Sequence, residues 1–333
     1  MSPSFERDPS STVRDLLRLC LPLTVAAMLL LLGLGLAAAQ GPVKLTRVTS
    51  ASDSDRDSYS PSISGDGTRV AFESDSDFLG QGIITGQLEI WLYDTATMTV
   101  TRVTTASGDG LRRSGNASVS DDGTVVAFHS SSDFLGQGID DGQMEIWLYD
   151  TATMTVTRVT TSSDGANRDS YYPSLSADGT VVAFASDSEL LGPSIANGQY
   201  EIWLYDTATM TVTRVTTSSD GDNRYSMRAS LSDDGNRVAF YSDSDFLGQG
   251  IDDEQFEIWL YDTATMTVTR VTTAAGSVNR DSWYPSLSGD GTKIAFESDS
   301  DFLSQSIPDG QYEIWLWEYL PEVYLPVVLR SGS

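Results

Sequence analysis

Pairs of acidic residues, each split by one serine, recur along the sequence in a pattern that could hold calcium. Carboxylate oxygens are the hard ligands that calcium prefers, and an extended segment places residues two apart on the same side. The alternative is that these acids solvate loops or cap turns. The sequence therefore predicts no cofactor other than calcium. The candidate ligands are Asp75, Asp77, Asp243, Asp245, Asp299 and Asp301, with Asp187-Ser-Glu189 and Ser131-Ser-Asp133 as weaker copies.

One arginine also recurs every 56 residues, three positions before a site that is aromatic in three of its five copies. A ring of guanidinium groups beside aromatic side chains could grip an anionic or carbohydrate ligand by charge-assisted hydrogen bonds and stacking. The alternative is that the arginines pair with nearby acids, such as Asp57, Asp169 or Asp281, and tie the repeats together. The candidate binding residues are Arg56, Arg112, Arg168, Arg224, Arg280, Tyr59, Tyr171 and Trp283.

Groups that could catalyse a reaction are scarce. His129 is the only histidine, no Gly-x-Ser-x-Gly segment occurs, and the single cysteine lies near the start of the chain, which excludes a zinc site of the usual ligands. We expect His129 to be a surface residue rather than a base. Carboxylates could serve a glycoside hydrolase, but here they recur in register instead of forming one unique pair. The sequence therefore predicts a protein that is not an enzyme.

These residues are carried by a repeat of 56 residues. Glu-Ile-Trp-Leu-Tyr-Asp begins at Glu89, Glu145, Glu201 and Glu257, and Glu313 begins a variant of it. Each copy contains four stretches with strand character and no helical periodicity; in the third copy they are residues 170–176, 180–184, 201–205 and 211–217. Four antiparallel strands repeated radially describe the blades of a β-propeller.

The strand count predicts how the ring closes. Five copies exist of the first, second and third strands, but only four of the outer strand. Leu45-Thr-Arg-Val-Thr49 matches the missing one, so we expect an all-β, five-bladed β-propeller of four-stranded antiparallel blades, closed by the N-terminal strand. The competing segment, residues 323–330, contains Pro326, which cannot donate to a strand ladder, so we place it at an edge or outside the ring.

The motif Tyr172-Pro-Ser-Leu-Ser-Ala-Asp-Gly-Thr-Val-Val-Ala-Phe184 and its four equivalents resemble the core of TolB-type, WD-like propeller repeats. The Glu-Ile-Trp-Leu-Tyr-Asp segments resemble the third strand of the same repeats, and the likeness covers nearly all of residues 43–318. It implies an exported protein that acts by binding. TolB-type rings usually have six blades and a separate N-terminal domain, and this sequence departs from both features.

The N-terminus is typical of an export signal. Arg7, Arg14 and Arg18 precede an apolar run that ends near a cleavage site at residues 37–39, although an uncleaved membrane anchor is the alternative. We expect residues 1–39 to be a signal peptide, 40–320 the propeller and 321–333 an extended tail. The product would be secreted or periplasmic, with no membrane span after cleavage. The net charge of −27 argues against a nucleic-acid partner.

The copies differ most in two sets of connections, before the first strand (Ser107 to Arg113 and equivalents) and between the second and third strands (Gln137 to Met144 and equivalents). Both sets emerge on the same face of an antiparallel blade, so that face is the expected binding surface. We therefore expect a monomeric, non-enzymatic module that binds a protein or ligand there. The alternatives are a lectin-like or calcium-dependent glycan binder and a glycoside hydrolase.

Overall fold

The computed structural model describes residues 44–51, 55–106, 112–140, 142–161, 168–192, 195–196, 198–218, 224–252, 254–274, 280–308 and 310–319. It divides into two units, Met1–Arg47 and Val48–Ser333, and the description below concerns the second. The expected signal peptide (1–39) and nearly all of the expected tail (321–333) lie outside the described residues. The described residues include no helix, and hence no helical segment able to cross a membrane.

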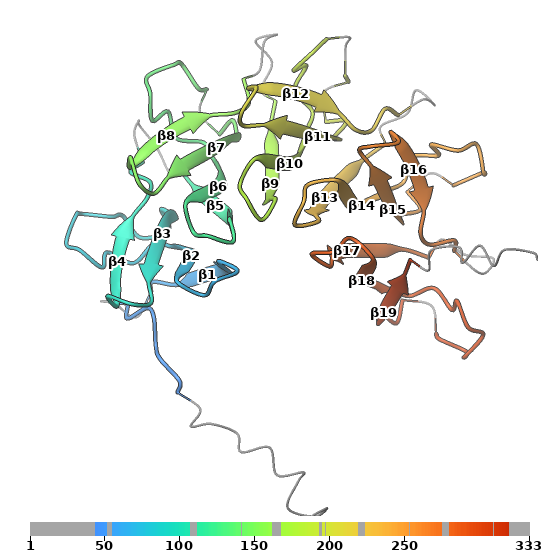
Figure 1. The fold of residues 1–333 in the computed structure, drawn as a ribbon, viewed down its shortest axis with the longest axis horizontal. Coiled ribbons are helices and arrows are strands. Elements are labelled where there is room, and N and C mark those ends of the chain that lie inside the picture. Colours follow the sequence, from blue (N-terminus) through green and yellow to red (C-terminus); the bar gives the residue numbers. More distant parts are fainter. Residues whose placement is uncertain are drawn as a thin grey trace, which may run out of the picture. The chain divides into compact units, whose positions relative to one another are not determined.

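Five antiparallel sheets make up this unit (Figure 1), and each corresponds to one 56-residue repeat. The first blade is β1 (Ser58–Ile63), β2 (Arg69–Ser74), β3 (Glu89–Asp94) and β4 (Thr99–Arg102); the second is β5 (Ser114–Val119), β6 (Val125–Ser130), β7 (Glu145–Asp150) and β8 (Thr155–Arg158); the third is β9 (Ser170–Leu175), β10 (Val181–Ser186), β11 (Glu201–Asp206) and β12 (Thr211–Arg214); the fourth is β13 (Ser226–Leu231), β14 (Arg237–Ser242), β15 (Glu257–Asp262) and β16 (Thr267–Arg270); the fifth is β17 (Ser282–Leu287), β18 (Lys293–Ser298) and β19 (Glu313–Glu318).

The strand types follow from the sequence pattern. The second and third strands are apolar on both faces because each blade packs against two neighbours, and Trp91, Trp147, Trp203 and Trp259 are almost completely buried. The outer strands alternate exposed threonine with half-buried valine or arginine. An edge strand with one solvated face is expected to show this period of two.

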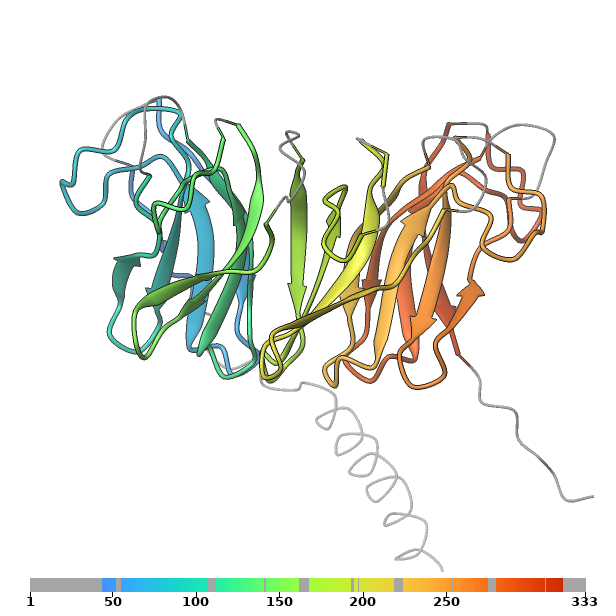
Figure 2. The same ribbon diagram turned by 90° about the horizontal axis from the view of Figure 1, so that it is seen from above.

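Successive blades share their cores. One apolar cluster joins Ala71, Ile90 and Leu92 of the first blade to Phe128 and Trp147 of the second, and equivalent clusters join the later blades. The inner strands β1, β5, β9, β13 and β17 therefore lie next to one another in chain order (Figure 1), and residues from all five line one central channel. Figure 2 shows the same blades turned by 90°. The predicted five-bladed β-propeller is confirmed.

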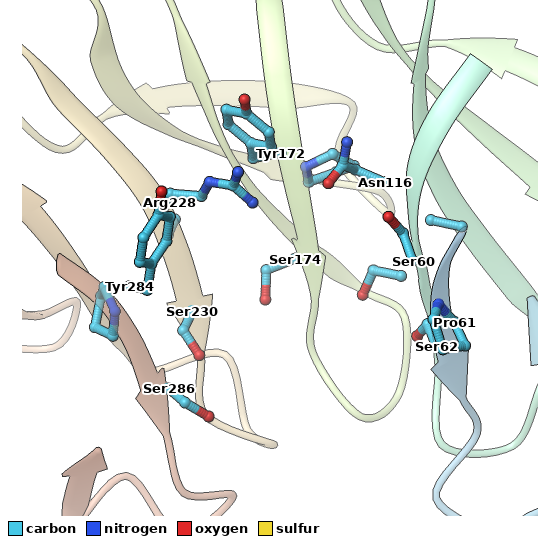
Figure 3. Close-up of a pocket in the computed structure, with 15 residues that line it drawn as sticks. Ser60, Pro61, Ser62, Asn116, Tyr172, Ser174, Arg228, Ser230, Tyr284 and Ser286 are labelled. Carbon is cyan, nitrogen blue, oxygen red and sulfur yellow. The ribbon is translucent and has the colours of Figure 1, made fainter. Parts of the chain in front are cut away.

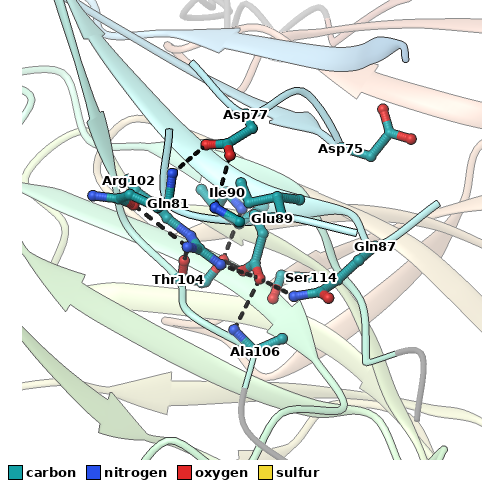
Figure 4. A network of polar contacts seen from close by, with 12 residues as sticks. Asp75, Asp77, Gln81, Gln87, Glu89, Ile90, Arg102, Thr104, Ala106 and Ser114 are labelled. Carbon is teal, nitrogen blue, oxygen red and sulfur yellow. Dashed lines mark hydrogen bonds and ion pairs between the residues drawn. The ribbon is translucent and has the colours of Figure 1, made fainter. Parts of the chain in front are cut away.

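A buried glutamate ties the outer strand to each of the first four blades. Glu89 is fully buried and accepts hydrogen bonds from Arg102 Nη2 (2.8 Å), Gln87 Nε2 (2.7 Å), the Ala106 N–H (2.8 Å) and the Thr104 hydroxyl (Figure 4). Glu145, Glu201 and Glu257 hold the corresponding arginine and threonine of their own blades. A buried charge is tolerated only when it is paired and hydrogen-bonded in this way.

The expected closure by the N-terminal strand is not among the strand pairings of the described residues. Residues 45–49 form no strand, and β19 pairs with β18 alone. Val48 instead packs beside Phe72 and Trp91 of the first blade, just as its repeat equivalents pack against the blade that follows them. Among the described residues, the outer edge of β19 therefore has no strand paired to it. Ile314 and Leu316 of β19 are consequently 78% and 64% exposed.

Candidate binding site in the central channel

Each inner strand contains a bulge that turns one side chain towards the channel. The pairing between the first and second strands slips once in every blade, around residue 60 and its equivalents. The residue in the bulge has a left-handed backbone, with φ between 49° and 55°, although it is never glycine. Bulges re-aim side chains, and a strained non-glycine backbone often marks a functional position. The five bulge residues are Ser60, Asn116, Tyr172, Arg228 and Tyr284.

These five bulge residues line a channel pocket with a volume of about 370 Å³ (Figure 3). The next two positions of each inner strand complete its wall with proline or alanine and then serine. The first four serines join the blades, because each hydroxyl oxygen accepts the main-chain N–H of the following blade; the Leu287 N–H, for example, lies 3.0 Å from Ser230 Oγ. The lining residues include no carboxylate, histidine or cysteine.

Arg228 is the only cation among the pocket-lining residues. Its guanidinium carbon lies 3.6 Å from the centre of the Tyr172 ring and 5.2 Å from that of Tyr284, so both rings hold it by cation–π contacts. Figure 3 shows the guanidinium between these two rings, with Asn116 farther along the wall. The described residues provide it with no ion pair and no hydrogen bond through the side chain.

His129 lies behind this wall, and its expected surface position is wrong. The imidazole is only 8% exposed and contacts the rings of Tyr171 and Tyr172, at 5.3 and 5.9 Å between centroids. Burial, with a smaller contribution from the Arg228 charge, lowers the pKa of His129 to about 4. The side chain is therefore neutral at neutral pH, and its Nδ1 accepts the main-chain N–H of Tyr172 at 3.5 Å.

The arginines that the sequence analysis singled out do not line the channel pocket. Arg168 Nη1 donates to the carbonyl oxygens of Asp187 (2.6 Å) and Ile195 (2.7 Å), and thereby holds the connection between β10 and β11. The other four make the equivalent pair of bonds within their own blades: Arg56, Arg112, Arg224 and Arg280. Each of these arginines therefore fixes the connection between the second and third strands of its own blade, and we call it a loop-clamping arginine.

The aromatic residues beside them serve contacts within and between blades. Tyr59 donates to Asp57 (2.8 Å) and Tyr171 donates to Asp169 (3.1 Å). Trp283 packs on Phe256 of the preceding blade, with 4.3 Å between ring centroids. The structure therefore does not gather the arginines and these aromatic residues around one ligand-sized space.

The acidic pairs cap the loops that follow the second strands. The two oxygens of Asp77 accept the N–H groups of Gln81 and Gly82, both at 2.7 Å (Figure 4), and these bonds hold its pKa below the usual value. Asp245 and Asp301 repeat this arrangement. Asp75, Asp243 and Asp299 accept the N–H that precedes the first strand of their blade. In the described part of the chain, no three acidic, histidine or cysteine side chains form a metal-binding group.

The bulge residues are not among the site residues predicted from the sequence, and the one sequence signal at their position is its variation between copies. The predicted residues are Tyr59 and its equivalents, whereas the next position reads Ser, Asn, Tyr, Arg and Tyr across the five copies. Of the loops expected to form the binding face, residues 107–111, 162–167, 219–223 and 275–279 lie outside the described residues.

Known structures share this architecture. A putative TolB from Agrobacterium tumefaciens has a TM-score of 0.50 and 19% identity, over 78% of this chain and 76% of that one. A prolyl endopeptidase has a TM-score of 0.52 and 13% identity, over 79% of this chain and 34% of that one. TolB from Acinetobacter baumannii has a TM-score of 0.46 and 22% identity, over 73% of this chain and 52% of that one.

The fold is therefore that of a TolB-like β-propeller. The sequence matches no protein-family model and no curated protein. Because the structural neighbours include a peptidase as well as TolB, and this chain spans about half of the A. baumannii protein and a third of the peptidase, the fold alone does not define the activity.

Proposed function

We propose that this protein is a non-enzymatic binding module that takes its ligand in the channel pocket. The observation that carries the proposal is the placement of variation. Thirteen consecutive residues, Tyr93 to Thr105 and equivalents, are identical in four copies, whereas the bulge residues differ in nearly every copy. Those bulge residues are also the ones that point into a pocket of ligand size. The residues that are identical between copies build the framework common to the blades, and the residues that differ form the surface that recognises a partner.

The polar groups near the channel support binding over catalysis. His129 is buried, and its Nδ1 faces a main-chain N–H. Glu73, the nearest carboxylate on the first blade, accepts the Ser60 hydroxyl and the Asn116 N–H, both at 2.9 Å. A glycoside hydrolase needs two carboxyl groups flanking its substrate, and the pocket lining contains none. The proposed partner is a protein or a small ligand rather than a substrate.

Export belongs to the same proposal. The basic and apolar pattern of residues 1–39 favours a secreted or periplasmic location, where a binding module without cysteine in its folded part needs no reducing environment. Detection of the protein in extracellular or periplasmic fractions, with Gln40 as the N-terminal residue, would support this part of the proposal. Retention in the inner membrane with an intact N-terminus would contradict it.

The binding proposal is tested with variants that empty the pocket without straining the backbone. Glycine adopts positive φ at no cost, so Asn116→Gly together with Tyr284→Gly removes two bulge side chains and keeps the strand path. The wild-type protein, the double variant and a control are each used to capture binding partners, and each is applied to a glycan array. The control is Thr213→Ala, on an exposed position of an outer strand. We expect the double variant to lose the partner and the control to keep it. Equal binding by all three proteins, or turnover of any captured molecule, would overturn the proposal.

A further inference from the structure

Arg228 lies in the pocket wall and lacks the hydrogen-bond and ion-pair partners that the side chains of most other described arginines of the ring have; Arg113, which shares this lack among the described residues, is exposed and does not line the pocket. Arg102, Arg158, Arg214 and Arg270 pair with buried glutamates, and Arg69 and Arg237 pair with Asp94 and Asp262. The loop-clamping arginines donate to main-chain carbonyls. Arg228 contacts only ring faces in the described part of the chain, and it is half-buried in the pocket wall. Its N–H groups are therefore left to meet a ligand.

The chemistry of this arginine favours an oxyanion. A guanidinium offers parallel N–H donors that match the two oxygens of a carboxylate, and stacking on Tyr172 fixes the plane in which they point. Little side-chain freedom is then lost when a ligand binds. Tyr172 and Tyr284, each followed by a proline, supply apolar wall for whatever group is attached to the carboxylate.

The charge of the whole chain limits how many negative charges the ligand carries. Forty-seven acidic and 20 basic residues give a net charge of −27, so a polyanion such as a nucleic acid or polyuronate is repelled along its length. A ligand with one carboxylate at its end meets the single arginine and avoids most of that repulsion. The pocket of about 370 Å³ also suits the end of a chain more than its middle.

We propose that the channel pocket captures the C-terminal carboxylate of a peptide, with Arg228 as the anchoring cation and Asn116 as a hydrogen-bonding partner for the last peptide groups. This inference rests on the proposed function and specifies the ligand. Capture of a terminal carboxylate is one of the recurring ways in which proteins read a chain end. The side chain of the last residue would lie against Tyr284 and Pro285.

The test compares peptides that differ only in the terminal charge. A pooled library of N-acetylated tripeptides is titrated into the full chain as free acids and as C-terminal amides, with acetate, inorganic phosphate and an oligouronate as further probes. We expect the acids to bind about tenfold more tightly than the amides, or about 1.4 kcal/mol, because only the carboxylate accepts charge-assisted hydrogen bonds from the guanidinium. Tighter binding of phosphate, acetate or the oligouronate than of any tripeptide acid would overturn the assignment.

The matched variants are Arg228→Gln, which removes the charge, and Arg228→Lys, which keeps it without the planar fork. We expect Gln to abolish the preference for acids, Lys to retain part of it, and Thr213→Ala to leave it unchanged, all with unaltered melting temperatures. Equal binding of acids and amides by the wild type would overturn the carboxylate assignment. If acids and amides bind equally but the double glycine variant still loses a partner, the binding function stands while this inference fails. If the double variant binds every partner normally, both fail.

Discussion

The buried glutamates of the repeat allow the same substitution to be made in two environments. Glu201 is fully buried and accepts hydrogen bonds from Arg214 Nη2 (2.7 Å), the Ser218 N–H (3.0 Å) and the Thr216 hydroxyl. Glu201→Gln would leave the guanidinium of Arg214 without its carboxylate and turn an amide NH₂ towards other donors. Breaking a buried pair from one side costs about 3–5 kcal/mol of folding free energy.

Glu313→Gln is the internal control. Glu313 has the same place in the fifth repeat, but it is exposed, and among the described residues its carboxylate accepts a hydrogen bond from Gln311 alone, at 2.6 Å. In the described part of the chain, no outer strand brings an arginine or threonine to it. The loss should therefore stay within about 0.5 kcal/mol, as for other surface substitutions.

Urea unfolding followed by far-ultraviolet circular dichroism measures both free energies on the same scale. We expect a large fall in the midpoint for Glu201→Gln and almost none for Glu313→Gln. Equal losses would show that a fourth strand completes the fifth blade in solution, which refutes the three-stranded blade. A loss below about 1 kcal/mol for Glu201→Gln would refute the importance of the buried pair.

Three further predictions concern a buried histidine, the acidic loops and a strained turn. The pKa of His129 is lowered to about 4 in the native state and is near 6.5 in the unfolded state, so the native state binds fewer protons between these pH values. The free energy of unfolding should therefore fall by about 3 kcal/mol as the pH drops from 6.5 to 4. His129→Gln should remove most of this dependence of the urea midpoint on pH. Since Asp245 accepts two main-chain N–H groups, a chelator should leave the melting temperature unchanged, and Asp245→Ala should cost about 1–2 kcal/mol with or without calcium; a rise of several degrees on adding calcium would contradict this. Met154 is 71% exposed with φ of 57°, so Met154→Asn should stabilise the protein by up to about 1 kcal/mol in the same urea assay, whereas a loss would show that the methionine has a packing role.

The repeat made the fold predictable, because a pattern copied five times averages out the ambiguity of any single strand. The boundaries of the second and third strands follow the β-branched runs and the Glu-Ile-Trp-Leu-Tyr-Asp segments closely. Closure was not predictable in the same way. Residues 45–49 have an outer-strand sequence, but the chain geometry that would bring them to β19 depends on the angle between blades, which no local pattern encodes.

The candidate site was predictable only in part. The recurring arginines looked available because a sequence does not show where main-chain carbonyl groups converge, and Arg168 in fact satisfies two of them. The acidic pairs were ambiguous for the same reason. The bulge around Tyr172 depends on a one-residue slip between two strands, so nothing local revealed that this residue, and not Tyr171, faces the channel pocket.

The distribution of hydrogen bonds connects these outcomes. Residues that recur in all or nearly all copies satisfy needs that the blades share: arginine clamps a loop, aspartate caps it in most copies, and glutamate holds the outer strand where that strand is present. Such needs require the same residue each time. The bulge position has no such need, and repeating Arg228 five times around one channel would add like-charge repulsion. A single arginine among Ser60, Asn116 and two tyrosines therefore has no role in the shared framework, and binding a ligand with one negative charge accounts for its presence.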